Sequence, residues 1–291
     1  MVAFLFPGQG SHEVGMGREL FLRPEGAEVW EEARKLGWEK PVFELSAEEL
    51  SRTSLAQPAI FLVEWVSFLA AKKLRAPDVV AGHSLGEFAA LAAAEVLSWP
   101  EAFSLVLLRG KLMEEAAEKF PGGMLALLGL SQGAAKRIAE DSGCFVANLN
   151  APTQVVLAGK RENLKKAEEL AQRAGGKVVP LPVAGAFHSP FMAEAAQRLA
   201  SALEELPFRP PKIAFISSST GDVERDPQRI KEILKAQMTS PVRWVAAVEK
   251  IAELGVEEAW EVGPGQVLTR LGRRITDRIR FRALSEVLGH V

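Results

Sequence analysis

The sequence predicts an α/β protein in which a parallel sheet carries a nucleophile elbow and a small α+β unit interrupts the main domain. Three observations lead to this prediction. Strand-like and helical segments alternate along the chain, a Gly-x-Ser-x-Gly pentapeptide joins a strand to a helix, and one internal stretch follows its own β-α-β-β-α-β order. We expect residues 1–121 and 184–291 to form the large domain and residues 122–183 to form the insert.

The first half of the large domain begins with a strand at residues 2–6, where successive apolar residues precede a glycine-rich loop. The elements expected after it are helices at 27–36, 47–50 and 58–74, a strand at 78–81, and helices at 87–97 and 99–119. The last of these helices begins with a capping box formed by Ser98 and Glu101, and Pro121 follows its end.

The insert is expected to contain four strands and two helices in the ferredoxin-like order. Along the chain these are a strand at 124–128, a helix at 132–141, strands at 145–149 and 154–158, a helix at 161–174 and a strand at 177–183. The large domain then resumes with a helix at 190–206, a strand at 213–217, helices at 227–238 and 241–254, a strand at 258–262 and a helix at 266–275.

The composition excludes several classes of function. Apolar residues make up 48% of the chain, charged residues 25%, and the net charge of −2 argues against nucleic acid as a partner. The single cysteine, Cys144, excludes a disulfide framework and suits a reducing compartment. The chain opens on a strand without a signal-peptide pattern, and its most apolar helix candidate, 59–71, contains Glu64 and is too short to span a bilayer. We therefore expect a cytoplasmic protein without a membrane partner.

Ser84 is the expected nucleophile because it lies between Gly82 and Gly86 where a β-branched strand meets an alanine-rich helix. Glycines are needed in such a turn, since the backbone leaves no room for Cβ atoms. The turn directs the serine hydroxyl toward the N-terminus of the helix, whose N–H groups favour developing negative charge. The alternative is a glycine-rich turn whose serine caps the helix.

The general base is sought among the histidines, of which the chain has four. His290 lies at the end of the chain, His83 adjoins Ser84 and points away from it, and His12 lies among polar residues at a candidate helix start. His188 lies in a loop of small residues where the insert returns to the large domain, and pockets form at such junctions. His188 is therefore the expected base, with a structural histidine that caps the next helix as the alternative.

Two further features concern charge near these residues. No carboxylate stands out as the third member of a triad, so a serine–histidine dyad with the imidazole oriented by main-chain carbonyls fits better. Arg109 lies on a helix that is apolar on most faces, and it must either extend to solvent or hold a buried anion such as a carboxylate. The periodicity leaves both possibilities open.

Seven motifs occur in the same order in a known family. They are residues 6–11, 82–87, 109–111, 148–159, 186–190, 240–244 and 261–265. With these motifs the chain resembles, over essentially its whole length, the malonyl-CoA:acyl carrier protein transacylases, a family that also supplies the acyltransferase domains of polyketide synthases.

The resemblance implies a hydrolase-like core with a ferredoxin-like insert and a dyad of Ser84 and His188. It also implies roles for four other residues: main-chain N–H groups of Gln9 and Leu85 as the oxyanion hole, Arg109 as the ligand of the malonyl carboxylate, and Gln237 as the residue that orients the histidine through its carbonyl. The triplet 186–188, Ala-Phe-His, accompanies malonyl rather than methylmalonyl selection in related acyltransferases.

The sequence departs from the family pattern at three positions: His12 replaces a common glutamine, Phe88 a common tyrosine and Gln266 a common lysine. None of them belongs to the dyad, Phe88 could alter the floor of the pocket, and His12 has no assigned role. The sequence leaves two alternatives to acyl transfer, namely a serine hydrolase or thioesterase and an inactive scaffold that binds a carrier protein.

The partners implied by the resemblance are malonyl-CoA and acyl carrier protein, in fatty-acid biosynthesis, with no metal or redox cofactor and a monomeric enzyme. Because the carrier protein of this family is acidic, we expect docking on basic side chains near the pocket mouth. The candidates are Lys160, Arg161, Lys165 and Lys166 on the insert, and Arg270, Arg273 and Arg274 near the C-terminus.

Overall fold

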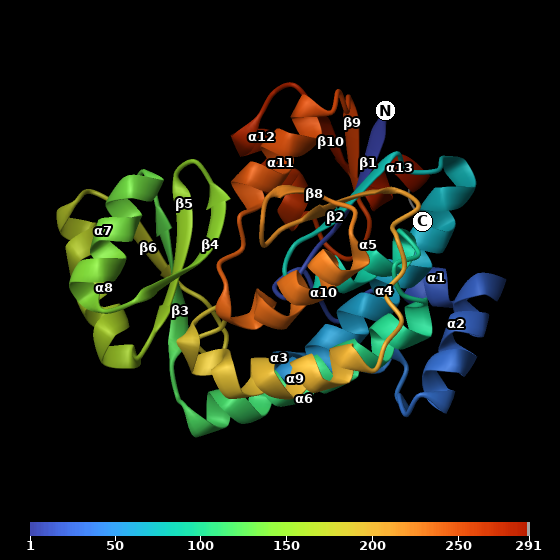
Figure 1. Cartoon of the computed structure of the whole chain (residues 1–291), viewed down its shortest axis with the longest axis horizontal. Helices are drawn as coiled ribbons and strands as arrows, with labels where there is room; N and C mark the ends of the chain where they lie inside the picture. Colours follow the sequence, from blue (N-terminus) through green and yellow to red (C-terminus); the bar gives the residue numbers. More distant parts are fainter. Residues whose placement is uncertain (290–291) are drawn as a thin grey trace.

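The computed structural model describes residues 1–289 and arranges them around two separate sheets (Figure 1). The larger sheet has the strand order β10-β9-β1-β2-β7-β8. Its strands are β1 (Val2–Phe6), β2 (Val79–Gly82), β7 (Ala214–Ser217), β8 (Asp222–Glu224), β9 (Glu258–Glu261) and β10 (Arg280–Ala283). All neighbours pair in parallel except β7 and β8, so the predicted parallel sheet is confirmed with one antiparallel edge strand.

Two of these strands, β8 and β10, were not expected from the sequence. β8 has only three residues, and β10 alternates arginine with apolar residues at the opposite edge. Edge strands are often short or charged, and both features discourage pairing with another chain. The same features weaken the apolar pattern from which strands are predicted.

Helices cover both faces of the larger sheet because alternate residues of each strand point to opposite sides. Phe4 and Phe6 of β1 belong to one core, and Ala3 and Leu5 belong to the other. The first core is covered by α4 (Thr53–Leu74), α5 (Gly86–Ala93), α6 (Trp99–Lys119), α9 (Ala193–Glu204) and α10 (Pro227–Ala236). The second is covered by α11 (Trp244–Glu253) and α12 (Val267–Ile275).

Four further helices and three turns complete the large domain within the described residues. They are α1 (Arg18–Phe21), α2 (Pro24–Lys35), α3 (Ala47–Ser51) and α13 (Leu284–Leu288), together with the 3-10 turns Val42–Glu44, Pro190–Met192 and Gln237–Thr239. The last two turns replace parts of predicted helices. The helix expected at 190–206 begins with a 3-10 turn, and the helix expected at 227–238 ends at Ala236 before another.

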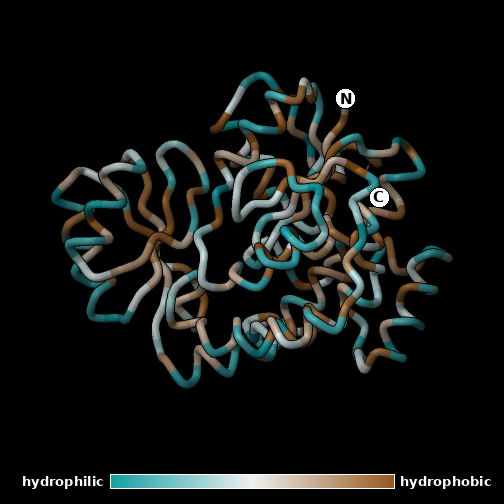
Figure 2. The backbone as a smooth tube through the Cα atoms, viewed as in Figure 1, coloured by the Kyte–Doolittle hydropathy of each residue, from teal (hydrophilic) through white to brown (hydrophobic). Residues whose placement is uncertain are grey.

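The insert has the predicted ferredoxin-like arrangement. Its strands β3 (Gly123–Leu128), β4 (Phe145–Ala151), β5 (Gln154–Gly159) and β6 (Lys177–Pro180) form a sheet of order β4-β5-β3-β6 in which all neighbours are antiparallel. Helices α7 (Gln132–Ser142) and α8 (Arg161–Arg173) cover one face and enclose a separate core. In Figure 2 the strands of the insert are apolar over most of their length, and its outermost loops are mainly hydrophilic.

The other face of the insert's sheet turns toward the large domain. Met124, Ala147 and Val156 of this face belong to the core of the large domain rather than to that of the insert. In addition, the main chain of β4 is hydrogen-bonded to Val242 of the large domain, through Leu149 N to Val242 O and Val242 N to Ala147 O, both 2.8 Å. These bonds fix the edge of the insert's sheet against the large domain.

The expectation that the most apolar helix is too short to span a bilayer is wrong. Helix α4 has 22 residues and begins at Thr53, so it is long and apolar enough by length and composition to cross a membrane. However, 83% of its most apolar 18-residue stretch is buried inside the protein, where the helix packs against the sheet and α6. Contacts within the core on nearly all sides thus account for its apolar composition.

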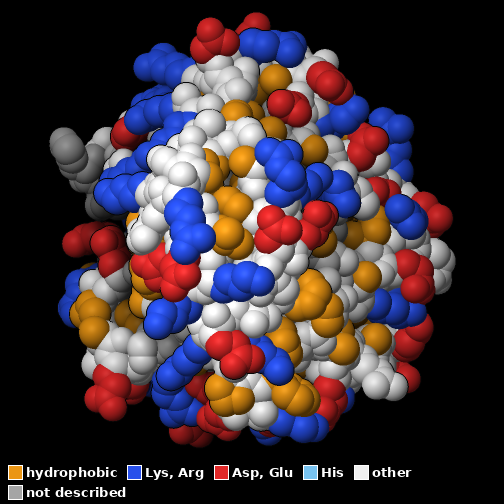
Figure 3. Space-filling model, turned by 90° about the vertical axis from the view of Figure 1, so that its left-hand side faces the viewer, with side chains coloured by type: hydrophobic (Ala, Val, Ile, Leu, Met, Phe, Trp, Pro, Cys, Tyr) orange, Lys and Arg blue, Asp and Glu red, His pale blue; other side chains and the backbone are white. Residues whose placement is uncertain are grey.

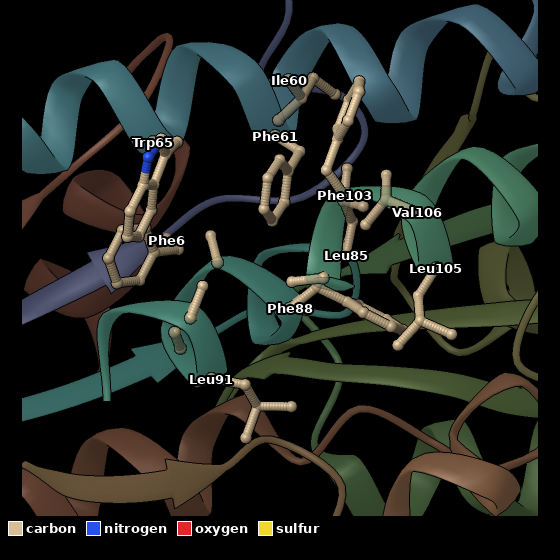
Figure 4. Packing of buried hydrophobic residues seen from close by; sticks show 14 of the residues in the cluster. Phe6, Ile60, Phe61, Trp65, Leu85, Phe88, Leu91, Phe103, Leu105 and Val106 are labelled. Atoms are coloured by element: carbon tan, nitrogen blue, oxygen red, sulfur yellow. The ribbon is translucent and has the colours of Figure 1, made fainter. Parts of the chain in front are cut away.

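The turn between β2 and α5 depends on its two glycines. A Cβ atom on Gly82 would overlap the main chain of Gly86, and one on Gly86 would overlap the carbonyl oxygen of Phe6. The side chains that follow the turn anchor it, because Leu85 and Phe88 belong to the same core as Phe61 of α4 and Phe103 of α6, and Phe88 extends toward Leu105 of α6 (Figure 4). The elbow is therefore held from both sides by close contacts.

We expect Gly86→Ala to lower the free energy of unfolding by about 1–3 kcal/mol or more, as overpacking of a dense interior does. Gly133→Ala is the matched control, because its Cβ would meet no atom closer than 3.9 Å and it lies on helix α7. That variant should gain about 0.4–1 kcal/mol. Equal effects of the two substitutions in urea unfolding would contradict the close packing of the elbow.

Candidate active site

Ser84 lies at the tip of the elbow with its backbone in the left-handed region, at φ 53°. His188, in the loop that leads from the insert back to the large domain, is also left-handed, at φ 56°. Non-glycine residues rarely adopt this conformation, and such strain is concentrated at functional sites. The two side chains meet, since Ser84 Oγ lies 2.7 Å from His188 Nε2.

The surroundings of His188 define its tautomer. Its Nδ1 atom lies 3.1 Å from the main-chain oxygen of Gln237 and 3.0 Å from that of Ser240. Carbonyl oxygens only accept hydrogen bonds, so Nδ1 carries the proton and donates it to them. The Nε2 lone pair is then directed at Ser84 Oγ and accepts a hydrogen bond from it, and among the described residues no carboxylate is hydrogen-bonded to either side chain.

The electrostatics keep His188 neutral. Burial, reinforced by the positive charge of Arg109, lowers the pKa of His188 to about 3. Burial also lowers the pKa of Arg109 to about 10, and the nearby carboxylate of Glu87 partly opposes this effect. At neutral pH the arginine is therefore charged and the imidazole is free to accept a proton.

Arg109 does not extend to solvent. Its side chain is 1% exposed, and its guanidinium donates from Nη1 to Gln57 Oε1 at 2.7 Å and from Nη2 to Gln237 Oε1 at 3.1 Å. Nη2 also lies 3.2 Å from Ser84 Oγ, and the guanidinium carbon stands 5.6 Å from the centre of the Phe88 ring. The arginine thus faces the nucleophile, and all of its hydrogen-bond partners among the described residues are neutral.

Gln9 and Leu85, the two residues expected to form the oxyanion hole, line the same cavity as Ser84. The loop that carries Gln9 presses against the elbow, because a Cβ on Gly8 would come within 2.6 Å of His83 O. Leu85 is the N-cap residue of α5, and within residues 1–289 neither main-chain N–H donates to a protein acceptor. Both are therefore available to bind a ligand oxygen.

The cavity has a volume of about 130 Å³ and lies between the large domain and the inner face of the insert. Besides the residues already described, Asn148 and Asn150 of β4 contribute to its lining. Asn150 Oδ1 lies 2.8 Å from His83 Nε2, so the histidine beside the nucleophile is bonded to the insert and not to Ser84. The insert thereby forms one wall of the site.

Three functional neighbours were not identified from the sequence: Gln57, Glu87 and Asn150. Gln57 and Glu87 are at most 1% exposed, and each contacts a residue of the site through its side chain. Glu87 and Asn150 lie inside two of the motifs, which is the only signal that could have singled them out. Gln57 precedes a proline at the start of an apolar helix and carries no such signal.

The remaining histidines take no part in the pair. His12 Nδ1 accepts from the main-chain N–H of Gly10 at 3.3 Å, and His12 does not line the cavity. His290 lies outside the described residues.

The elbow, and the serine and histidine side chains that meet at its tip, have the arrangement found in enzymes of the serine-nucleophile class. Over residues 3–289 the sequence matches the acyl transferase domain family. It is 38% identical to the malonyl CoA-acyl carrier protein transacylase of Bacillus subtilis, across 98% of this chain and 93% of that protein. The chain therefore belongs to the acyl transferase family, as its motifs predict.

Solved structures agree with this assignment. The acyl-carrier-protein S-malonyltransferase of Burkholderia pseudomallei superposes with a TM-score of 0.92 at 34% identity, over 99% of both chains. A malonyl-transacylase in complex with a type II polyketide acyl carrier protein gives a TM-score of 0.92 at 35% identity, over 97% of this chain and 95% of that one. The two-subdomain fold is thus common to these proteins.

The lowered pKa of His188 predicts an unusual pH dependence. Since the base stays neutral until the pH falls toward about 3, the rate at which a fluorophosphonate labels Ser84 should be constant from about pH 8 to about pH 5. A histidine with the ordinary pKa of about 6.5 would lose most of its neutral form over that range. Mass spectrometry of the labelled protein measures the rate, and an acid limb centred near pH 6.5 would contradict the effect of burial.

Proposed function

We propose that this protein transfers a malonyl group from malonyl-CoA to the phosphopantetheine thiol of acyl carrier protein through a malonyl ester on Ser84. The observation that carries the proposal is that one hydroxyl, Ser84 Oγ, lies 2.7 Å from a neutral base and 3.2 Å from a buried cation. In a malonyl thioester the carboxylate is separated from the attacked carbonyl by a single methylene. A cation beside the nucleophile matches that spacing, and its planar fork suits a carboxylate.

In the first half of the cycle, His188 Nε2 takes the proton of Ser84 Oγ while the oxygen attacks the thioester carbonyl. The negative charge that develops on the carbonyl oxygen is stabilised by the main-chain N–H groups of Gln9 and Leu85. The carbon–sulfur bond then breaks, and the coenzyme A thiolate receives the proton from His188. The malonyl group remains as an ester on the serine.

The second half reverses these steps with another thiol. His188 takes the proton of the phosphopantetheine thiol, whose sulfur attacks the ester carbonyl in the same oxyanion hole. The bond between carbon and Ser84 Oγ breaks, and the serine oxygen recovers the proton from His188. Because His188 performs every proton transfer, the proposed cycle requires neither a metal nor a redox cofactor.

The relatives support the choice of acyl groups and partner, since several are named for malonyl transfer to acyl carrier protein. We further propose that the protein acts in fatty-acid biosynthesis, that it is located in the cytoplasm and that it is a monomer. The division into residues 1–121 plus 184–291 and residues 122–183 likewise remains a proposal for where the two domains separate.

For the carrier protein we propose basic side chains on the insert as the docking contacts. Lys160 and Arg161, at the start of α8, border a hollow of about 340 Å³ together with Phe120 and Phe191. Near the C-terminus, Arg273 and Arg274 already donate to Phe281 O and Gln154 Oε1. On the face that carries the insert, positive and negative side chains are interspersed (Figure 3). Selection of the carrier protein would therefore depend on individual charge pairs and not on the overall charge of this face.

A serine hydrolase with water as the acceptor has the same elbow, and it is the alternative that must be tested. We expect brief exposure to malonyl-CoA to leave a malonyl adduct on Ser84, detected by mass spectrometry of the proteolysed protein. Ser84→Ala should abolish both the adduct and the transfer while the protein stays folded, because the lost hydroxyl contributes nothing to core packing. Steady release of free malonate without a thiol acceptor would instead identify a hydrolase.

Arg109→Ala tests the assigned substrate. Removing the cation should cost malonyl transfer about 2–5 kcal/mol, the range for breaking a desolvated charge pair. The rate of transfer from acetyl-CoA should fall far less. In the unaltered protein an uncharged acyl group already leaves the buried guanidinium without an anion, so acetyl transfer gains nothing from the arginine.

The matched control for Arg109→Ala is Lys111→Ala, an exposed cation on the same helix, which should leave both rates unchanged. Equal losses for malonyl-CoA and acetyl-CoA in Arg109→Ala would assign the arginine a structural role only.

A further inference from the structure

Glu87 is a buried acid for which the proposed reaction has no use. It lies in the first turn of α5, three residues after the nucleophile, and it is 0% exposed. One of its carboxylate oxygens, Oε1, has no hydrogen-bond partner among the described residues. Burial without full hydrogen bonding destabilises a carboxylate, so core packing alone does not account for an acid at this position.

The other oxygen of Glu87 connects it to the active site. Glu87 Oε2 accepts from Gln237 Nε2 at 2.7 Å and from Ser218 Oγ at 3.2 Å. The amide nitrogen of Gln237 also donates to the main-chain oxygen of Ser84 at 2.9 Å. Both hydrogens of this amide are therefore engaged, one by the main-chain oxygen of Ser84 and the other by Glu87 Oε2.

These bonds determine what Gln237 presents to Arg109. With both amide hydrogens directed at Glu87 and Ser84, the carbonyl Oε1 faces the guanidinium and accepts from Arg109 Nη2 at 3.1 Å. The reverse orientation would bring the amide oxygen against two acceptors and the amide N–H groups against a cation. Nη2 is also the nitrogen that lies 3.2 Å from Ser84 Oγ, so its position decides where a substrate carboxylate can bind.

We propose that Glu87 is a positioning residue that acts through Gln237 to hold Arg109 beside the nucleophile, and thereby contributes to the selection of acyl groups with a carboxylate. The inference rests on the proposed malonyl transfer. It assigns Glu87 no contact with the substrate and no proton transfer. His188 is held by the main-chain oxygen of Gln237, in a 3-10 turn, so the dyad does not depend on the orientation of the amide.

The test is Glu87→Met, which keeps the length of the side chain and removes the acceptor. Malonyl transfer should fall on the order of tenfold or more, as expected for the loss of a hydrogen bond to a charged group, while acetyl transfer changes by less than about twofold. Glu87→Gln keeps an acceptor oxygen toward Gln237 and should restore most of the malonyl activity. Equal losses for both acyl groups would overturn the proposal.

A double-mutant cycle shows whether the effect passes through the arginine. In an Arg109→Ala background, Glu87→Met should have almost no further effect on the ratio of malonyl to acetyl transfer, and an undiminished effect would contradict the proposal. Glu64→Met is the matched control, because Glu64 is equally buried on α4, its carboxylate oxygens have no partner within residues 1–289, and it does not line the cavity. It should leave the ratio unchanged.

A second measurement does not depend on activity. The side-chain NH2 signals of Gln237, identified by their absence in Gln237→Leu, should be protected from hydrogen exchange in the unaltered protein and in Glu87→Gln, and should lose protection in Glu87→Met. Unchanged protection in Glu87→Met would overturn the proposal even if the protein proved not to transfer malonyl groups. Conversely, a failure of malonyl transfer in the unaltered protein would refute the proposed function and leave this measurement decisive for Glu87.

Discussion

The hydrogen bond between Ser84 and His188 depends on a turn that only glycine permits on either side. The main chain crosses itself so closely at the end of β2 that neither Gly82 nor Gly86 has space for a Cβ atom. The same turn forces Ser84 into the left-handed region and brings the start of α5 against the loop that carries Gln9. One backbone constraint therefore positions Ser84, the main-chain N–H groups of Gln9 and Leu85 that we propose as the oxyanion hole and, a turn later, Glu87.

A second constraint is electrostatic, since the site contains a buried cation without a carboxylate in contact with it. Gln57 and Gln237 stabilise Arg109 with the dipoles of their side-chain amides, which solvate the charge without neutralising it. Burial lowers the pKa of His188, and the positive charge of Arg109 lowers it further, so the imidazole stays neutral. The same positive charge also favours an anionic ligand in the cavity, as the role proposed for Arg109 in substrate selection requires.

The insert closes this arrangement from the opposite side. Its sheet has helices on one face only, and the other face meets the large domain and supplies Asn148 and Asn150 to the cavity. Main-chain bonds from β4 to Val242 and the contact between Asn150 and His83 fix the insert close to the elbow. The wall that faces Ser84 and Arg109 therefore comes from a different sheet than the elbow, and it brings two amide side chains close to the buried charge.

The sequence by itself determined the parallel sheet, the ferredoxin-like insert, the elbow and the serine–histidine pair, because these depend on local periodicity, on glycine spacing and on a short list of histidines. It did not determine whether Arg109 faces solvent or the nucleophile, nor which side chains surround it. Gln57, Glu87 and Gln237 come from three helical segments far apart in the chain, and their contacts arise only when those segments pack. The edge strands β8 and β10 and the full length of α4 also required the tertiary structure, since pairing and burial, rather than local apolar patterns, decide them.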